Sequence, residues 1–259
     1  MPSRLPISVL LLARDETRRL ESLLPELAFA EEVVVIWDPR GPGETRGVAE
    51  RLGARVLPRE FAGFGPQRQF ALARCTQPWV LWIDADERLD AAALDGLRLA
   101  VGSSPREAGF TVERRSYFLG RRIRFCGWQG ERVLRLFRRE CARFDDARVH
   151  ERVHVEGPAG RLPGTLEHDT YSSWEECVRK LRDYAHGGAQ SAFAAGGSAG
   201  PLDVALRPPL RFLRMYVLQL GLLDGFHGFL VCGLAAAQVF LKYAELWTLG
   251  RHQVRGEPR

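Results

Sequence analysis

The stretch from Trp79 to Glu87 joins an apolar run directly to three acidic side chains. Five consecutive apolar residues, two of them tryptophans, are typical of a strand that is covered on both faces of a parallel sheet. Ligands of such sheets bind at the carboxyl ends of the strands, where Asp84 and Asp86 would lie. In an extended chain these carboxylates share one side and repel each other unless a cation separates them. The stretch therefore predicts a divalent-ion site shared with substrate phosphates; the alternative is a turn whose acids only cap a helix near Asp90.

The whole composition is that of a globular, basic protein. The 259 residues suffice for one large α/β domain with an appendage. No signal-peptide pattern opens the chain, so a cytosolic protein is expected. Five scattered cysteines without a Cys-x-x-Cys pair argue against a disulfide framework and a zinc site.

Arginine dominates the basic residues. All but Lys180 and Lys242 of the 37 basic residues are arginines, and the net charge is +5. Guanidinium groups bind phosphate bidentately, so nucleotide phosphates or anionic lipid headgroups are expected partners, with a coding bias toward arginine as the alternative. Nucleic acid is not expected as a partner, because no recognised binding motif accompanies the charge.

Apolar runs and helical patterns alternate along the first hundred residues. This alternation predicts βαβ units and a parallel sheet, with strands over 7–12, 33–36, 54–57 and 79–83 and helices over 20–27, 48–52 and 63–72. Pro66 suits the first position of the third helix, whose N-terminus would offer amides to an anion. Later patterns predict a helix from Leu89 to Val101, strands over 109–112, 133–137 and 148–154, and an amphipathic helix from Trp174.

These motifs, in this order, resemble the family 2 glycosyltransferases, which are inverting enzymes of the GT-A fold, and within them the lipopolysaccharide core β-1,4-glucosyltransferase subgroup. The resemblance covers residues 5–247 and is carried by 13–16, 63–72, 81–87, 127–128 with 135–137, 149–151 and 240–243. It implies a Rossmann-like, mostly parallel sheet flanked by helices. We expect a catalytic domain over 1–186 with its nucleotide-sugar half over 1–100 and its acceptor half over 101–186, a linker over 187–200, membrane-associating helices over 201–247 and a flexible tail over 248–259.

The resemblance also assigns the donor site. It implies that Asp84 and Asp86 form an Asp-x-Asp motif, in which Asp86 holds Mg²⁺ or Mn²⁺ against the diphosphate and Asp84 contacts the ribose or the metal. Further donor contacts are implied for Arg14, Asp15, Glu16, Asp38, Gln67 and Arg68. The family's usual Asp-Ser-Gly-Ser-Thr-Asp run is replaced here by residues 37–45, which contain two prolines, so UDP specificity stays open.

An inverting transfer needs one base that deprotonates the acceptor hydroxyl. The resemblance implies Glu131 for this role, because it occupies the place of an acid four residues before Arg135. The alternative for Glu131 is a surface salt bridge with Arg132 or Arg135. His150 and Glu151 are further candidates for the base or a metal contact, although a lone histidine in a strand is more often structural.

Two residues are candidates for acceptor binding. Trp128 could stack on an acceptor sugar, and core packing is its alternative. Arg135 could contact the acceptor, and its alternative is a solvated side chain.

The segment from 201 to 247 combines arginines with apolar runs. Arg207, Arg211 and Arg214 precede an uncharged run from Gly225 to Leu241. That run would reach roughly 25 Å as a helix, short of a hydrocarbon core of about 30 Å. It therefore favours a helical hairpin lying in the membrane interface, against the alternative of two helices buried on the catalytic domain.

The expected protein is a metal-dependent inverting glycosyltransferase. It would move a hexose, with glucose from UDP-glucose as the leading donor, onto a lipid-linked saccharide such as lipopolysaccharide core at the cytoplasmic face of the inner membrane. One alternative is a catalytically silent nucleotide-sugar or membrane binding protein, suggested by the altered 37–45 segment. A sugar-phosphate nucleotidyltransferase is disfavoured, because no glycine- and arginine-rich loop follows the first strand.

Overall fold

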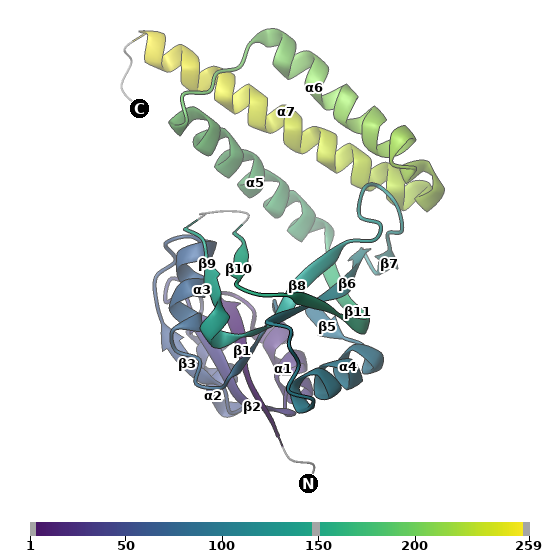
Figure 1. Ribbon diagram of the computed structural model, residues 1–259. Helices are drawn as coiled ribbons and strands as arrows, with labels where there is room; N and C mark the ends of the chain where they lie inside the picture. Colours follow the sequence, from purple (N-terminus) through teal and green to yellow (C-terminus); the bar gives the residue numbers. More distant parts are fainter. Residues whose placement is uncertain (1–3, 147–150, 256–259) are drawn as a thin grey trace. The chain divides into compact units, whose positions relative to one another are not determined.

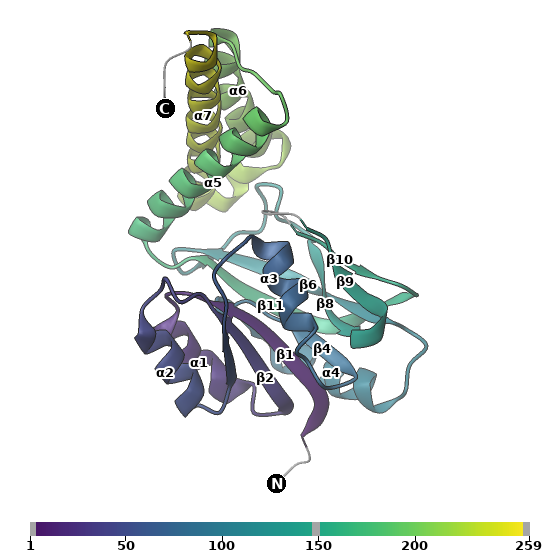
Figure 2. The ribbon, with the colours of Figure 1, turned by 90° about the vertical axis from the view of Figure 1, so that its left-hand side faces the viewer.

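The computed structural model describes residues 4–146 and 151–255 (Figures 1 and 2). The chain divides into two compact units. The first, the sheet unit, comprises residues 1–114 and 130–168, and the second, the helical unit, comprises 115–129 and 169–259.

Four parallel strands form one half of the sheet. They are β1 (Leu5–Ala13), β2 (Ala30–Trp37), β3 (Arg55–Pro58) and β4 (Trp79–Trp82), in the order β3-β2-β1-β4. The crossovers contain α1 (Thr17–Glu26), α2 (Gly43–Arg51) and α3 (Phe64–Leu72). The predicted βαβ units are therefore confirmed, with one correction: Pro66 is the third residue of α3. That position is still in the first turn, where a missing N–H costs nothing.

The central strand β1 is apolar on both faces because helices cover both. Val9 and Leu11 belong to one buried cluster with Leu20 of α1, whereas Leu10 belongs to a second with Leu72 of α3. Successive side chains of a strand point to opposite faces. A continuous apolar run is thus what a strand with two covered faces requires.

The other half of the sheet contains antiparallel pairs. It contains β8 (Arg132–Arg138), β6 (Gly109–Phe118), β11 (Ala159–Tyr171) and β5 (Glu87–Leu89), and β4 pairs with β8; β7 (Arg121–Arg122) pairs with β6. The sheet is thus mixed, because β8 runs antiparallel to both of its neighbours, β4 and β6.

Several boundaries in this half differ from the prediction. Leu89 ends β5 instead of starting a helix, and α4 (Ala91–Gly102) begins after Asp90, whose side chain accepts the Ala93 N–H at 2.8 Å. A separate hairpin joins β9 (Ala142–Phe144) to β10 (Val153–Val155). Only the end of the predicted 148–154 strand is thus observed, and residues 147–150 lie outside the described residues.

The helical unit contains α5 (Trp174–Ala194), α6 (Pro201–Leu213), a π-turn η2 (Arg214–Leu218), a 3₁₀ turn η3 (Gly221–Asp224) and α7 (Gly225–Arg255). Helices α6 and α7 lie side by side in both views (Figures 1 and 2). The ring of Phe229 packs edge-to-face on Phe212 and Tyr216, with centroids 5.6 and 6.1 Å apart. The predicted hairpin is therefore present, with its turn just before Gly225.

Two predicted boundaries in this unit are wrong. Helix α5 continues to Ala194, through the glycine and alanine stretch in which a linker was expected from residue 187. The small residues serve packing there: Ala185 and Ala189 are buried, and a Cβ on Gly188 would lie 3.2 Å from Cδ of Lys242 in α7. Helix α7 likewise continues to Arg255, where a flexible tail was expected from 248.

Candidate active site

The chain turns sharply where β4 ends. The N–H of Glu87 donates to the carbonyl of Asp84 at 3.0 Å, so residues 84–87 form a turn and not an extended segment. The expectation that Asp84 and Asp86 share one side of an extended chain is therefore wrong. Each carboxylate has partners of its own.

Asp84 is held by two arginines. It accepts Nη2 of Arg68 at 2.9 Å and Nη2 of Arg135 at 3.3 Å, and the indole N–H of Trp82 at 3.3 Å. Both guanidinium groups also lie over the Trp82 ring, 4.2 and 4.1 Å from its centroid. Burial disfavours the charged carboxylate, but the two arginine charges outweigh it and hold the pKa of Asp84 well below its usual range. Asp84 is thus a fixed anion.

Glu87 is the buried partner of Arg135. Its side chain is 0% exposed and accepts Nη2 of Arg135 at 2.6 Å and the N–H of Asp84 at 3.1 Å. Burial raises the pKa of Glu87 although Arg135 opposes the shift. The Arg135 side chain is only 4% exposed, so the solvated alternative is wrong. The structure places Arg135 inside the acidic cluster and not on an open acceptor surface.

Arg68 connects this cluster to the segment before β10. Its Nε donates to Glu151 at 2.5 Å, and Nη1 is buried without a hydrogen-bond partner. Glu151 therefore joins Asp84 at the same arginine. His150 lies outside the described residues.

Asp86 faces His168, a residue that no sequence motif indicates. Nε2 of His168 lies 3.6 Å from Oδ2 of Asp86. His168 is on β11, which pairs His168 with Glu87 across the antiparallel ladder. No motif spacing relates residues 86 and 168, so only the register of β5 and β11 reveals this pair.

The Asp86–His168 pair fits a divalent ion. Carboxylate oxygen and imidazole nitrogen are both ligands of Mn²⁺, and ions of this kind take their remaining ligands from substrate phosphates and water. Within 4–146 and 151–255, no group of three or more His, Cys, Asp or Glu residues could hold a metal.

Glu131 pairs with Arg114, not with the arginines that the sequence suggested. Arg114 donates from Nη2 to Oε1 at 2.8 Å and from Nε to Oε2 at 3.1 Å. Arg132 instead donates to the carbonyls of Thr111 and Leu162 at 2.9 and 3.1 Å. The alternative of a salt bridge for Glu131 is thus observed, but with Arg114 and not with Arg132 or Arg135. The Glu131 side chain remains 40% exposed.

The loops after β1 and β2 lie together at the same edge of the sheet. The N–H of Asp38 donates to Ala13 at 3.0 Å, and a Cβ on Gly41 would lie 2.2 Å from the carbonyl oxygen of Arg14. Asp38 accepts Nε and Nη2 of Arg40 at 2.9 and 2.7 Å, and these bonds lower its pKa. Both carboxylate oxygens of Asp38 are therefore bonded by Arg40, a residue of the altered 37–45 segment itself.

The other predicted donor contacts lie on neighbouring elements. Asp15 and Glu16 follow β1 with Arg14, and Glu16 pairs with Arg19 at 3.2 Å. Gln67 of α3 is buried and donates to the carbonyl of Arg59 at 2.9 Å. Its side-chain oxygen has no hydrogen-bond partner.

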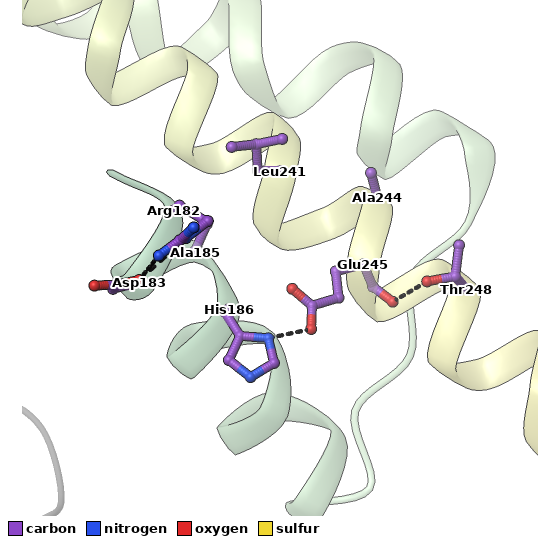
Figure 3. Close-up of a pocket in the computed structure, with 8 residues that line it drawn as sticks. All are labelled: Arg182, Asp183, Ala185, His186, Leu241, Ala244, Glu245 and Thr248. Atoms are coloured by element: carbon purple, nitrogen blue, oxygen red, sulfur yellow. Dashed lines mark hydrogen bonds and ion pairs between the residues drawn. The ribbon is translucent and has the colours of Figure 1, made fainter. Parts of the chain in front are cut away.

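The helical unit contains a separate pocket (Figure 3). Its volume is about 620 Å³, and α5 and α7 line it with Arg182, Asp183, Ala185, His186, Leu241, Ala244, Glu245 and Thr248. His186 and Glu245 join the two helices at 2.6 Å. None of the predicted site residues lines this pocket. Trp128, the predicted acceptor residue of this unit, is half-buried against the apolar cluster of Phe118 and Cys126.

A family model described as "Glycosyl transferase family 2" matches residues 17–149, more than half of the chain. The chain belongs to glycosyltransferase family 2. This result confirms the predicted family, the enzyme class and the α/β fold with a C-terminal apolar helix.

Curated relatives of this glycosyltransferase include one from lipopolysaccharide synthesis. The chain is 30% identical over 264 residues to "Lipopolysaccharide core biosynthesis glycosyltransferase LpsC" of Rhizobium meliloti, covering 100% of this chain and 97% of the relative. It is 25% identical to the "Uncharacterized glycosyltransferase RP128" of Rickettsia prowazekii, covering 93% and 86% of the two chains. Among solved structures, the mannosyltransferase PcManGT of Pyrobaculum calidifontis, in complex with GDP-Man and Mn²⁺, aligns with a TM-score of 0.49 and 15% identity, covering 99% and 77%.

Proposed function

We propose that this glycosyltransferase moves a hexose, with UDP-glucose as the leading donor, onto a lipid-linked saccharide such as lipopolysaccharide core. The observation that carries the proposal is the acidic turn of Asp84, Asp86 and Glu87 at the end of β4. Because β1 and β4 are parallel neighbours, their carboxyl ends share one edge, and this turn lies at the same edge as the loops after β1 and β2. Nucleotide ligands of α/β sheets bind at such an edge.

In the proposed site, Asp86 and His168 would hold Mg²⁺ or Mn²⁺ together with the donor diphosphate. The bound ion would offset the charge that develops on the leaving diphosphate. Asp84, fixed and ionised between Arg68 and Arg135, would contact the ribose. Arg14, Asp15, Glu16, Asp38 and Gln67 would line the rest of the donor site.

Glu131 is the proposed base. Its partly exposed carboxylate can accept the proton of an acceptor hydroxyl, and a positioned base of this kind contributes roughly 10²- to 10⁴-fold in rate. Glu151 is the second candidate, because its side chain is only 9% exposed, against 40% for Glu131. His150 remains a third candidate, and Trp128 a candidate for stacking on the acceptor sugar.

The partner surface that we propose for the helical unit is an anionic membrane. Exposed apolar side chains recur every three or four residues along α6 and η2 and thus share one face: Leu202, Leu206, Leu210, Leu213 and Val217. The exposed arginines Arg207, Arg211 and Arg214 follow the adjacent line of the same helix. Leucines in the acyl boundary with arginines at the phosphates are typical of a helix that lies in the interface.

The alternative to an interfacial hairpin is that helix α7 spans the membrane. Within the described residues, Gly221–Arg251 is the one helical segment long and apolar enough to cross a membrane, and 17% of its most apolar window is buried. Helix α7 is longer than the uncharged run from Gly225 to Leu241, because it continues to Arg255. We propose the interfacial arrangement, on the cytoplasmic face of the inner membrane, since Lys242, Glu245 and Arg251 interrupt the apolar run.

A donor screen tests the proposed reaction. Release of nucleotide diphosphate is measured for UDP-, GDP- and ADP-hexoses with extracted lipid-linked saccharides as acceptors, and calorimetry measures donor binding with and without Mn²⁺. We expect acceptor-dependent release with one donor. Donor binding without release for every acceptor would instead favour the catalytically silent binding protein.

A further inference from the structure

Arg114 lies between two carboxylates of the sheet unit. Its fork donates to both oxygens of Glu131 at 2.8 and 3.1 Å, and its Nη1 lies 3.9 Å from Oε1 of Glu87. Its backbone N–H also donates to the carbonyl of Glu131 at 2.8 Å. Backbone and side chain of Arg114 thus fix the same residue.

The two carboxylates differ in their access to solvent. Glu87 is 0% exposed, Arg114 is 23% exposed and Glu131 is 40% exposed. Arg114 is in the strand β6, whereas Glu131 precedes β8 by one residue. The guanidinium therefore connects an open carboxylate outside the strands to a buried one within the sheet.

The same arrangement continues to the acidic turn. Glu87 accepts Arg135, which also donates to Asp84. Charges alternate in sign along Glu131, Arg114, Glu87, Arg135 and Asp84, so each arginine is held by carboxylates on two sides. Such a network fixes side chains at a lower entropic cost than isolated pairs.

We infer that Arg114 is the positioning residue for the base Glu131, an inference that rests on the proposed function. A bidentate guanidinium takes one lone-pair site on each carboxylate oxygen and leaves the other sites for an acceptor hydroxyl. Without the fork, the exposed Glu131 side chain rotates among several rotamers, and a misplacement of about 1 Å can cost about 10²-fold in rate. Arg114 thus acts on the proton transfer through Glu131 and not on the donor.

The test is a double-mutant cycle of Arg114→Met with Glu131→Gln in the full chain. We expect Arg114→Met to lower kcat by about 10²-fold while the KM for the donor changes by less than about threefold, because only the base is misplaced. Arg114→Lys keeps the positive charge but not the guanidinium fork, so it should recover part of the loss in kcat. In the Glu131→Gln background, Arg114→Met should cause no further loss.

The matched control is Arg132→Met, which removes the same charge from the neighbouring strand β8. The Arg132 side chain bonds the carbonyls of Thr111 and Leu162 and not the carboxylate of Glu131. Its kcat should stay near the wild-type value, and thermal melting of all variants checks that they fold. Additive losses in the cycle, or an unchanged kcat in folded Arg114→Met, would overturn the positioning role. Wild-type activity of Glu131→Gln would instead overturn the proposed base itself.

Discussion

At the residue scale, the site depends on how each carboxylate is paired. Asp84 and Asp86 are two positions apart in the sequence, yet the turn gives the first to two arginines and the second to a histidine. Arginine pairs keep Asp84 ionised and immobile, which suits hydrogen bonds to a ligand. Asp86, beside an imidazole, is the better candidate for a metal ligand.

The metal assignment predicts the behaviour of Asp86→Asn. This variant should fold but turn over at least about 10²-fold slower, because an amide removes one ligand charge from the ion that offsets the diphosphate. Asp95→Asn, on the exposed face of α4, is the control for loss of one surface carboxylate. Initial rates at saturating donor measure the effect. Full activity of Asp86→Asn, or of the wild type in excess chelator, would exclude the metal role.

The pair of Asp38 and Arg40 predicts a pH dependence of stability. Arg40 lowers the pKa of Asp38 below its usual 3.8 in the folded protein. The unfolded chain therefore binds a proton at a higher pH than the folded one, so this stabilisation is complete above pH 4 and is lost as the pH falls below it.

Urea unfolding of the wild type and Asp38→Asn, at pH values from 6 to 3, measures this dependence. The wild type should be more stable at pH 6, and the difference should shrink toward pH 3. A difference that grows on acidification would contradict the assigned ion pair.

At the element scale, glycines decide how closely the C-terminal elements pack. A Cβ on Gly228 of α7 would lie 2.0 Å from the backbone oxygen of Gly221, whereas a Cβ on Gly233 of the same helix would meet nothing within 4 Å. The first glycine is required by packing against η3, and the second is not.

This difference predicts opposite effects of two alanine substitutions. Gly228→Ala should destabilise the protein by about 1 to 3 kcal/mol, since backbone atoms must shift. Gly233→Ala should stabilise it by up to about 1 kcal/mol through helix propensity. Thermal melting measures both, and equal shifts in the same direction would contradict the packing of α7 on η3.

At the scale of the whole molecule, the proposed reaction needs an enzyme beside its lipid acceptor. The helical unit offers the leucine face and the arginine line of α6, which are separate contributions to membrane binding. The leucines and the arginines can each be substituted without changing a buried residue, because the side chains of both groups are exposed.

Vesicle flotation of the full chain separates the two contributions. We expect the wild type to float with anionic vesicles. A triple change to Ser at Leu202, Leu206 and Leu210 should weaken flotation at every salt concentration. A triple change to Gln at Arg207, Arg211 and Arg214 should weaken it chiefly at low salt, where the attraction between charges is least screened. Failure of the wild type to float would exclude the membrane surface. Protease cleavage on both sides of the vesicle would instead show that α7 spans.

The sequence by itself determined the parallel half of the sheet, the family and the position of the acids after β4. These follow from local patterns: apolar runs with both faces covered, helical spacing between them, and acids placed directly after β4. The sequence also located the hairpin turn before Gly225, because glycine tolerates the positive φ of 63° found there. Composition alone misjudged the end of α5, where Gly188 packs against Lys242 of α7, and the end of α7, which continues to Arg255.

Only the tertiary structure decided which charges meet. His168 reaches Asp86 through the register of β5 and β11, and Arg114 reaches Glu131 across the end of the β6–β8 ladder. These partners are 82 and 17 positions apart in the chain. Antiparallel pairing is set by side-chain burial over whole strands and not by any local motif. A sequence pattern therefore names the acids of this site, whereas the fold assigns each of them its partner.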